Sequence, residues 1–478
     1  MKELSALDTL FLGTDSVRYP MHGLGMMVLD PSTAPSPVTY DSMKEHFRRR
    51  LPDLPPMRRR LVRVPLGLDR PVWVEDPNFD LDEHFHHVAV PPPGDREALA
   101  ELVSEIGHIP LDDNRPLWQY WFIEGLARGR VAVLLKMHHA CIDGMGGIEM
   151  VQHLFDLEPD PERDDPVDTW EPEEVPSPAA MLLRAAPNVV TWPLRAAKSS
   201  TNLASGLARG RRARQRADSH AGKAFSGPKV SFNRIVHDKP HKNLAWMSVS
   251  MDDVKTIRND YGATVNDVAL ALVGGSLHRY LDDGHELPDE PLIVANPINL
   301  READESGAYE NKVAMMAPKL PVQIADPVER LKEIVASTGD TKAASAAART
   351  NLLEDLFGVV NPGVVDVIMH AYTTSGVAGL LPAPYNLCIT NLIGPPIPLY
   401  FNGARLDRFY IQMMLFDTIG IVVALMSYAG RLQFGVTATR ELTPNVWSIA
   451  DGIEEEMRLL LASVGASPTS EKSEIDSA

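Results

Sequence analysis

The chain alternates between short apolar runs and stretches in which apolar residues recur every three or four positions. Short apolar runs bounded by turn-forming residues are typical of β-strands. They predict strands at 22–29, 118–123, 131–137, 292–300, 385–390, 406–414, 419–427 and 431–438. Apolar residues at helical spacing predict helices at 41–51, 95–106, 264–281, 327–348 and 444–463. Both halves of the chain therefore contain predicted strands and helices.

The pattern breaks near the middle of the chain. About ten acidic residues and several prolines fill 156–175, which predicts an exposed linker. The segment that follows, 181–217, begins with apolar residues and ends with arginines. Two interpretations of it stay open. It is either an amphipathic basic helix lying on an anionic membrane surface, or a crossover helix that packs on the protein and leaves its basic end in solvent.

This break sets the expected domain organisation. We expect an N-terminal domain over 1–157, an acidic and then basic connecting segment over 158–224, and a C-terminal domain over 225–466. The polar residues 467–478 are expected to be a disordered tail. A length of 478 residues agrees with two or three domains, because single cores rarely grow that large.

Composition narrows the classes of function. A net charge of −18 makes nucleic acid an unfavourable partner, and 44% hydrophobic residues are typical of a globular protein. Two cysteines, Cys141 and Cys388, are too few for a disulfide framework. The first residues lack the basic and then apolar pattern of a signal peptide, and no run has the length of a transmembrane helix. We therefore expect a cytoplasmic protein, at most peripheral to a membrane or lipid droplet.

The candidate chemistry lies where the predicted strand at 131–137 meets a glycine-rich turn. His138 and His139 are neighbours, so on a strand their side chains point to opposite faces and cannot share one role. A histidine is the usual general base near neutral pH, and Asp143 across the turn would orient an imidazole. The alternative is a pair of structural histidines with a capping aspartate. A metal site is disfavoured because no HExxH spacing or nearby cysteine pair occurs. These residues alone leave the choice open.

Further motifs occur in a fixed order around this doublet. They are HHxxxDG at 138–144, PLW at 116–118, ND at 266–267, PINLR at 297–301 and TNLIGP at 390–395. Over about residues 5 to 462 the chain resembles the bacterial wax ester synthase/diacylglycerol acyltransferases of the HHxxxDG CoA-dependent acyltransferase superfamily. It departs from that pattern at 390–394, where SNVPG is more usual, and at Asn299, where serine is more usual.

The resemblance implies an α/β fold of two chloramphenicol-acetyltransferase-like domains. Each would be a mixed β-sheet flanked by helices, with the active-site channel at their interface. His139 would be the general base, His138 structural, and Asp143 a residue that holds the geometry. Asn266 would contact the oxyanion or the substrate. Further candidate substrate contacts are Trp118, Gly144, Thr390, Asn391 and Arg301. For Trp118, a place in the channel wall and a place in the core are equal alternatives. Arg301 is also the expected partner of Asp143.

The implied reaction transfers an acyl group from a fatty acyl-CoA to diacylglycerol or to a long-chain alcohol. Acyl-CoA is then a substrate, and neither a cofactor nor a metal is expected. Three other interpretations remain. They are a carrier-dependent condensation or polyketide-ester acyltransferase, a non-catalytic lipid-binding protein, and a membrane-surface scaffold that uses 182–216.

Overall fold

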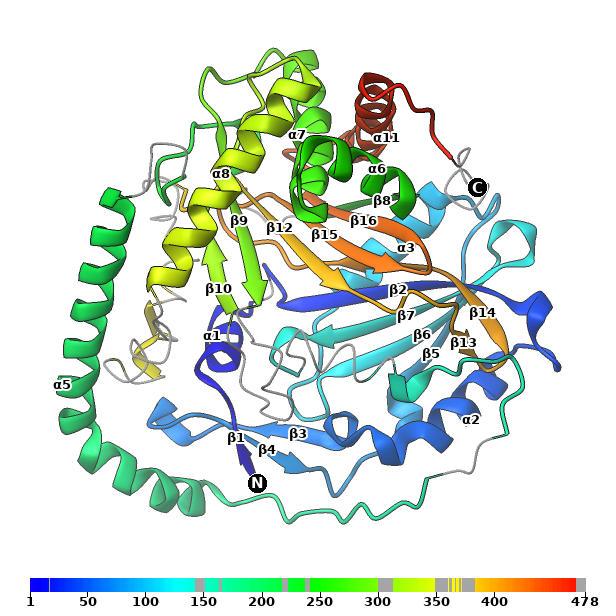
Figure 1. Ribbon diagram of the computed structural model, residues 1–478. Helices are drawn as coiled ribbons and strands as arrows, with labels where there is room; N and C mark the ends of the chain where they lie inside the picture. The colour runs from blue at the N-terminus through cyan, green and yellow to red at the C-terminus, as the bar shows by residue number, and fades with distance from the viewer. Residues whose placement is uncertain are drawn as a thin grey trace.

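The structure is a computed structural model with two large β-sheets, one from each half of the chain (Figure 1). A small third sheet contains β1 (Lys2–Glu3), β4 (Val72–Glu75) and β3 (Arg59–Val62). The structure describes residues 1–16, 18–141, 150, 152–162, 166–216, 222–236, 241–299, 313–348, 360, 363–365, 367–368, 371 and 383–469. Short 3-10 turns connect the elements at Pro31–Thr33, Leu51–Asp53, Pro55–Arg58, Pro65–Gly67, Leu81–Glu83, Ala127–Gly129, His139–Cys141 and Ser231–Asn233.

The N-terminal sheet has six strands. In spatial order they are β13 (Tyr400–Phe401), β14 (Ala404–Gln412), β2 (His22–Asp30), β7 (Val131–His138), β6 (Trp118–Glu124) and β5 (Phe85–Ala89). Every neighbouring pair is antiparallel except β5 and β6, which are parallel. This mixture of pairings agrees with the mixed sheet that was expected.

Alternate side chains of β7 enter two different cores. Val133 and Leu135 pack in the cluster that contains Phe47 of α2 (Tyr40–Arg50). Ala132 and Leu134 pack in the cluster that contains Val103 of α3 (Arg96–His108). That second cluster also contains Leu244 and Trp246, which belong to the C-terminal sheet. The α3 face of the N-terminal sheet therefore contacts the C-terminal sheet, and the cluster on the α2 face also includes Met426 and Tyr428 of β15 (Ile421–Tyr428).

The C-terminal sheet has seven strands. In spatial order they are β10 (Val313–Met316), β9 (Leu292–Asn299), β12 (Leu387–Ile393), β15 (Ile421–Tyr428), β16 (Arg431–Thr439) and β8 (Lys242–Ser250), with β11 (Lys319–Leu320) paired to β9. Four helices of this half have their bounds described: α6 (Met251–Tyr261), α7 (Val265–Asp283), α8 (Pro327–Ala348) and α11 (Val446–Ser463). Their apolar side chains and those of one sheet face form the largest buried cluster.

Helix α7 approaches α11 closely around a buried charge. Glu456 of α11 accepts hydrogen bonds from Arg279 at 2.9 Å and from Arg330 at 2.5 Å. A Cβ atom at Gly275 would lie 2.0 Å from the Glu456 carboxyl carbon, so only glycine fits there. The small residues in the helix predicted at 264–281 therefore make room for an ion pair.

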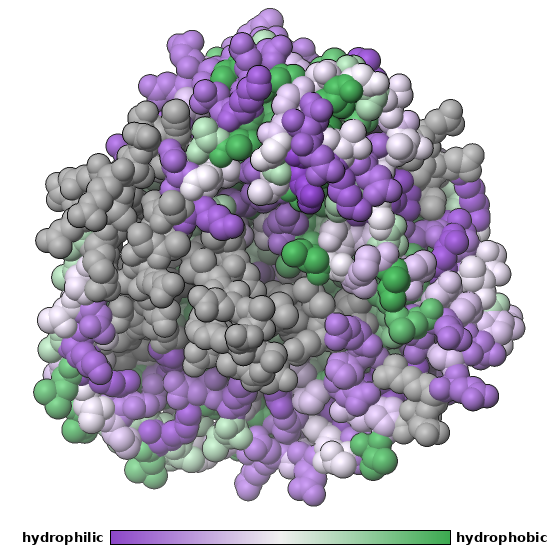
Figure 2. All heavy atoms as spheres, in the orientation of Figure 1, coloured by the Kyte–Doolittle hydropathy of each residue, from purple (hydrophilic) through white to green (hydrophobic). Residues whose placement is uncertain are grey.

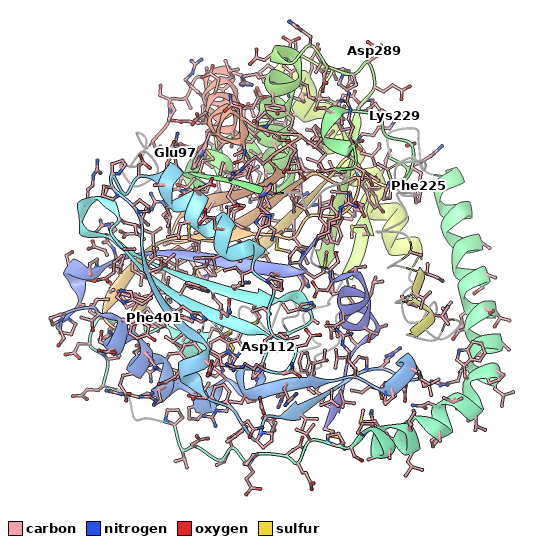
Figure 3. The ribbon with its side chains drawn as sticks, turned by 180° about the vertical axis from the view of Figure 1, so that it is seen from behind. Glu97, Asp112, Phe225, Lys229, Asp289 and Phe401 are labelled. Carbon is pink, nitrogen blue, oxygen red and sulfur yellow. The ribbon has the colours of Figure 1, made fainter. Side chains whose placement is uncertain are left out.

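The C-terminal half contributes two strands to the N-terminal sheet. β13 and β14 come from the predicted C-terminal domain but complete the N-terminal sheet, where β14 pairs with β2. Phe401 of β13, labelled in Figure 3, lies 5.3 Å from the ring of Phe155 and 4.7 Å from that of His46. The domain limits at 157 and 225 stay a prediction, and the N-terminal sheet does not follow them, because it includes β13 and β14.

The connecting segment wraps around the outside of the molecule. Between 166 and 177 it is held by contacts such as Trp170 Nε1 donating to Glu75 Oε2 at 2.8 Å and Arg58 donating to Asp168 at 2.8 Å. It then enters α5 (Pro178–Arg216), which runs along the lower and left edges of Figure 1. Helix α1 (Ala6–Thr14) lies between α5 and the sheets in the same view.

Most predicted elements are confirmed with ends shifted by a few residues, and the helix at 327–348 is confirmed at both ends. Helix α3 continues to His108, beyond the predicted end at 106, and Thr264 is the N-cap of α7. Strand β12 does not end at Thr390, because its pairing with β15 continues to Ile393.

The expected disordered tail is described in part. Thr469 donates a side-chain hydrogen bond to Asp253 of α6 at 2.7 Å, so the beginning of 467–478 lies on the protein. Residues 470–478 lie outside the described residues.

Candidate active site

The histidine doublet lies at the end of β7. The strand ends at His138, and His139 begins the 3-10 turn His139–Cys141. The N–H of His138 donates to the carbonyl of Leu117 at 2.9 Å, and the N–H of His139 donates to the carbonyl of Met21 at 2.8 Å. The two consecutive N–H groups therefore bond to segments on opposite sides of the chain, and the two side chains have different surroundings.

His138 is a buried, neutral residue. Its side chain is 2% exposed, and burial lowers its pKa to about 3. Nδ1 accepts the N–H of Ala140 at 3.1 Å, so the neutral ring carries its proton on Nε2. Nε2 lies 3.8 Å from Asp15 Oδ2, and the ring of His22 on the paired strand is 6.0 Å away. These contacts fit the structural role that was expected for His138.

His139 is half-buried and packs against Phe11 of α1, with 4.2 Å between the ring centroids. Burial lowers the pKa of His139 to about 4, so its imidazole is neutral at neutral pH. A neutral imidazole has one nitrogen able to accept a proton. Within the described part of the chain, Nδ1 has no hydrogen-bond partner. The ring is thus in the protonation state that a general base requires.

Three predicted site residues cannot be placed. Asp143, Gly144 and Arg301 all lie outside the described residues. Their expected roles, in holding the turn and contacting substrate, stay predictions.

Asn266 lies in the first turn of α7, one position before Asp267, which forms a capping box with Thr264. The Asn266 Nδ2 atom donates to Asn296 Oδ1 at 3.4 Å, and Asn296 Nδ2 donates to the carbonyl of Ile389 at 2.7 Å. This chain of amides joins α7, β9 and β12. Asn266 and the strand that carries Thr390 are therefore close together, as the resemblance implied.

Thr390 and Asn391 point to opposite faces of β12, because they are neighbours on a strand. Ile389, on the face of Asn391, belongs to the core under α7. Cys388, on the face of Thr390, packs in the cluster that contains Met21 and is joined by Phe11. Thr390 therefore faces the N-terminal half, on the side where Phe11 meets His139.

The predicted candidate Trp118 is a core residue, and Cys141 beside the doublet is partly buried. Trp118 is 1% exposed, donates from Nε1 to the carbonyl of Met57 at 2.8 Å and stacks on His84 at 4.3 Å. This burial favours the core alternative over a place in a channel wall. Burial also raises the pKa of the Cys141 thiol, and Sγ lies 3.9 Å from the carbonyl of Leu117. Cys141 therefore lacks the thiolate that a nucleophile needs.

Sequence reasoning did not find the polar groups that surround the doublet. His22 and Lys242 are buried, and burial lowers the pKa of Lys242 to about 8 and that of His22 much further below its usual range. Burial raises the pKa of Asp15. The apolar partner Phe11 was also missed. No sequence signal links these residues to His139, because strand pairing and helix packing bring them together.

No group of three or more histidine, cysteine or acidic side chains able to hold a metal occurs in the described part of the chain.

Among the helices that the structure describes, none combines the length and the apolar character needed to cross a membrane.

Comparison with known proteins gives the family. The wax ester synthase/diacylglycerol acyltransferase catalytic domain matches residues 4–269, and the WS/DGAT C-terminal domain matches residues 309–461. A Mycobacterium tuberculosis (strain CDC 1551 / Oshkosh) protein whose name assigns it as a diacylglycerol O-acyltransferase is 34% identical over 478 residues. The match covers 96% of this chain and 90% of that protein.

Solved structures confirm the predicted fold. The wax ester synthase/diacylglycerol acyltransferase from Marinobacter aquaeolei VT8 has a TM-score of 0.69 at 23% identity, covering 97% of this chain and 100% of the other. The first condensation domain of the calcium-dependent antibiotic synthetase has a TM-score of 0.53 at 14% identity, covering 98% and 97%. Two mixed sheets with covering helices are thus the chloramphenicol-acetyltransferase-like architecture. The chain belongs to the wax ester synthase/diacylglycerol acyltransferase family and is an acyltransferase.

Proposed function

We propose that this acyltransferase moves the acyl group of a fatty acyl-CoA to the free hydroxyl of diacylglycerol, and makes triacylglycerol. A long-chain alcohol is the second acceptor and gives a wax ester. The family and the name of the Mycobacterium tuberculosis relative support these substrates. The observation that carries the chemistry is the state of His139, which is neutral and half-buried beside a fully buried neighbour.

His139 is the proposed general base. An alcohol has a pKa of roughly 16, near that of water, so it attacks poorly without help. As the hydroxyl oxygen bonds to the thioester carbon, the proton passes to the imidazole of His139. When the tetrahedral intermediate collapses, the C–S bond breaks and the same proton goes to the CoA thiolate. A positioned base contributes a factor of about 10²–10⁴ in rate. No covalent enzyme intermediate and no net proton uptake are needed.

Thr390 is the proposed donor to the developing oxyanion. Its side chain lies on the same face of β12 as Cys388, which packs in the cluster that contains Met21 of the N-terminal half. Asn266 is proposed as a substrate contact, because its partner Asn296 lies on the α7 face of the sheet, opposite to Thr390. Its amide makes a long bond of 3.4 Å to Asn296, so a shift toward substrate costs little. Asn391, Gly144 and Arg301 remain proposed substrate contacts. Asp143 is proposed to hold the turn by pairing with Arg301.

The enzyme is proposed to work at the surface of a membrane or lipid droplet, since both acceptors are lipids that dissolve there. A channel between the two halves would admit acyl-CoA from one side and the acceptor from the other. Phe11 packs on His139 and joins the cluster that Cys388 of β12 also contacts, and this proximity of the two halves supports the arrangement.

One assay tests the proposal. Purified protein receives palmitoyl-CoA with either diolein or hexadecanol, and the lipid products are resolved while free thiol is measured. We expect triacylglycerol or wax ester in amounts equal to the thiol released. Turnover only after a carrier protein is added would favour the condensation-type alternative, whose fold is similar. Binding of labelled acyl-CoA without thiol release would favour a lipid-binding protein.

A further inference from the structure

We propose that the outward face of α5 docks on an anionic lipid surface. This inference rests on the proposed function only in that the substrates lie in such a surface. Its physical basis is a helix that is apolar on the side turned away from the protein.

Helix α5 contacts α8, and one side of its N-terminal part packs against the small sheet. Met181 and Ala185 are buried in a cluster with Val64, Val72 and Val74. Asn188 donates to Asp69 at 2.6 Å, and Arg184 donates to Glu3 at 3.2 Å. These contacts fix the orientation of the helix, so its opposite side stays in solvent.

That opposite side carries large aliphatic side chains. Leu183, Val190 and Leu194 are 76%, 77% and 77% exposed. Spacings of seven and four residues place them in one stripe along the helix, and Met181 and Ala185 lie about half a turn away from it. In Figure 2 strongly hydrophobic residues stand at the lower left rim, where Figure 1 shows this part of α5. A surface helix of a soluble protein normally turns such a stripe inward.

The positive charge of α5 favours an anionic lipid surface as the partner of this helix. The helix contains eight arginine and lysine residues and no acidic residue, although the whole chain has a net charge of −18. An apolar stripe combined with basic residues is the pattern of helices that lie in the plane of an anionic membrane. The two interpretations of 181–217 are therefore compatible, because one side of the helix packs on the protein and the other meets lipid.

Figure 3 shows that α5 forms the outer edge of the molecule when it is viewed from behind, with side chains directed outward along it. Docking through this edge would place the small sheet and α1 next to the lipid. Phe11 of α1 packs against His139, so this edge lies on the side of the proposed base.

Vesicle flotation of the full chain tests the inference. The vesicles contain phosphatidylcholine alone or phosphatidylcholine with phosphatidylglycerol. We expect binding to the mixed vesicles that weakens as salt is added. The triple variant Leu183→Gln, Val190→Gln, Leu194→Gln should bind at least about tenfold more weakly, because each exposed aliphatic group loses its transfer into lipid. Glutamine keeps the helix propensity nearly unchanged.

The matched control is the triple variant Ile109→Gln, Leu157→Gln, Val167→Gln, which removes three exposed aliphatic side chains outside α5. It should bind like the unchanged chain. Equal binding by the α5 variant, or no binding by the unchanged chain, overturns the inference. The inference is also overturned if the apolar stripe of α5 serves only to join two copies of the chain. Sedimentation of the protein without lipid would reveal such a dimer.

Turnover is measured separately with a soluble acceptor, hexanol, in the absence of lipid. The α5 variant should release thiol from acyl-CoA as fast as the unchanged chain. Vesicle binding without any turnover would refute the proposed function and leave the docking surface intact. Turnover without vesicle binding would refute the docking surface and leave the proposed function intact.

Discussion

The strand ends that face each other across the two halves carry different chemistry. In the N-terminal half, the end of β7 gathers groups that titrate, namely His138, His139 and the paired His22. In the C-terminal half, β12 carries the Thr390 hydroxyl, which does not titrate, and the amides of Asn296 and Asn266 lie on the opposite, α7 face of the same sheet. Similar sheets thus provide a proton acceptor on one side and fixed dipoles on the other. This division suits a reaction that moves a proton and develops an oxyanion.

The largest expected effect comes from removing the base. His139→Ala should lower kcat by about 10²–10⁴ and leave the melting temperature nearly unchanged, because the side chain is half-buried. Thiol release with palmitoyl-CoA and diolein measures it. The control is His87→Ala, an exposed histidine of β5. Near-normal turnover of the His139 variant would end the assignment of the base.

The next effect tests the non-titrating side. Thr390→Val should lower kcat by on the order of 10²–10³ with little change in KM, because a donor to the oxyanion is lost. Thr390→Ser, which keeps the hydroxyl donor on the same face of β12, should change kcat much less. Steady-state kinetics of both variants decide this. Equal losses in the two variants would mean that the Thr390 hydroxyl is not the donor.

A third prediction concerns pH. Because burial lowers the pKa of His139 to about 4, the base stays neutral well below pH 6.5. The profile of kcat/KM should therefore stay flat down to about pH 5.5, where a histidine of ordinary pKa would already cost roughly tenfold. An acid limb centred near 6.5 would show that the free enzyme holds this imidazole in a more polar environment.

The smallest effect is on stability. His22 and His138 are buried and their pKa values are lowered, so the unfolded chain binds more protons than the folded chain below about pH 6.5. The free energy of unfolding should fall as pH falls through that value. Each of the two histidines contributes a decrease of up to about 1.4 kcal/mol per pH unit. Denaturant unfolding of the protein and of His22→Gln measures it. The variant should show the shallower slope, and identical slopes would contradict the prediction.

The predictable part of the site consists of residues whose role depends on near neighbours in the chain. His138 and His139 alternate because strands alternate, and the chain turns immediately after them. Periodicity likewise located the helix at 327–348. Thr264 was not recognised as the cap of α7, because Asn266 and Asp267 are equally common at helix starts.

The sequence by itself determined the family, the order of the elements and the position of the histidine doublet, since local spacing carries that information. Only the tertiary structure decided that β14 joins the N-terminal sheet, that Phe11 packs on His139 and that Trp118 is a core residue. It also decided which side of α5 is exposed. These outcomes depend on contacts between residues far apart in the chain, and a local pattern of apolar and polar residues does not specify the partner against which a face packs.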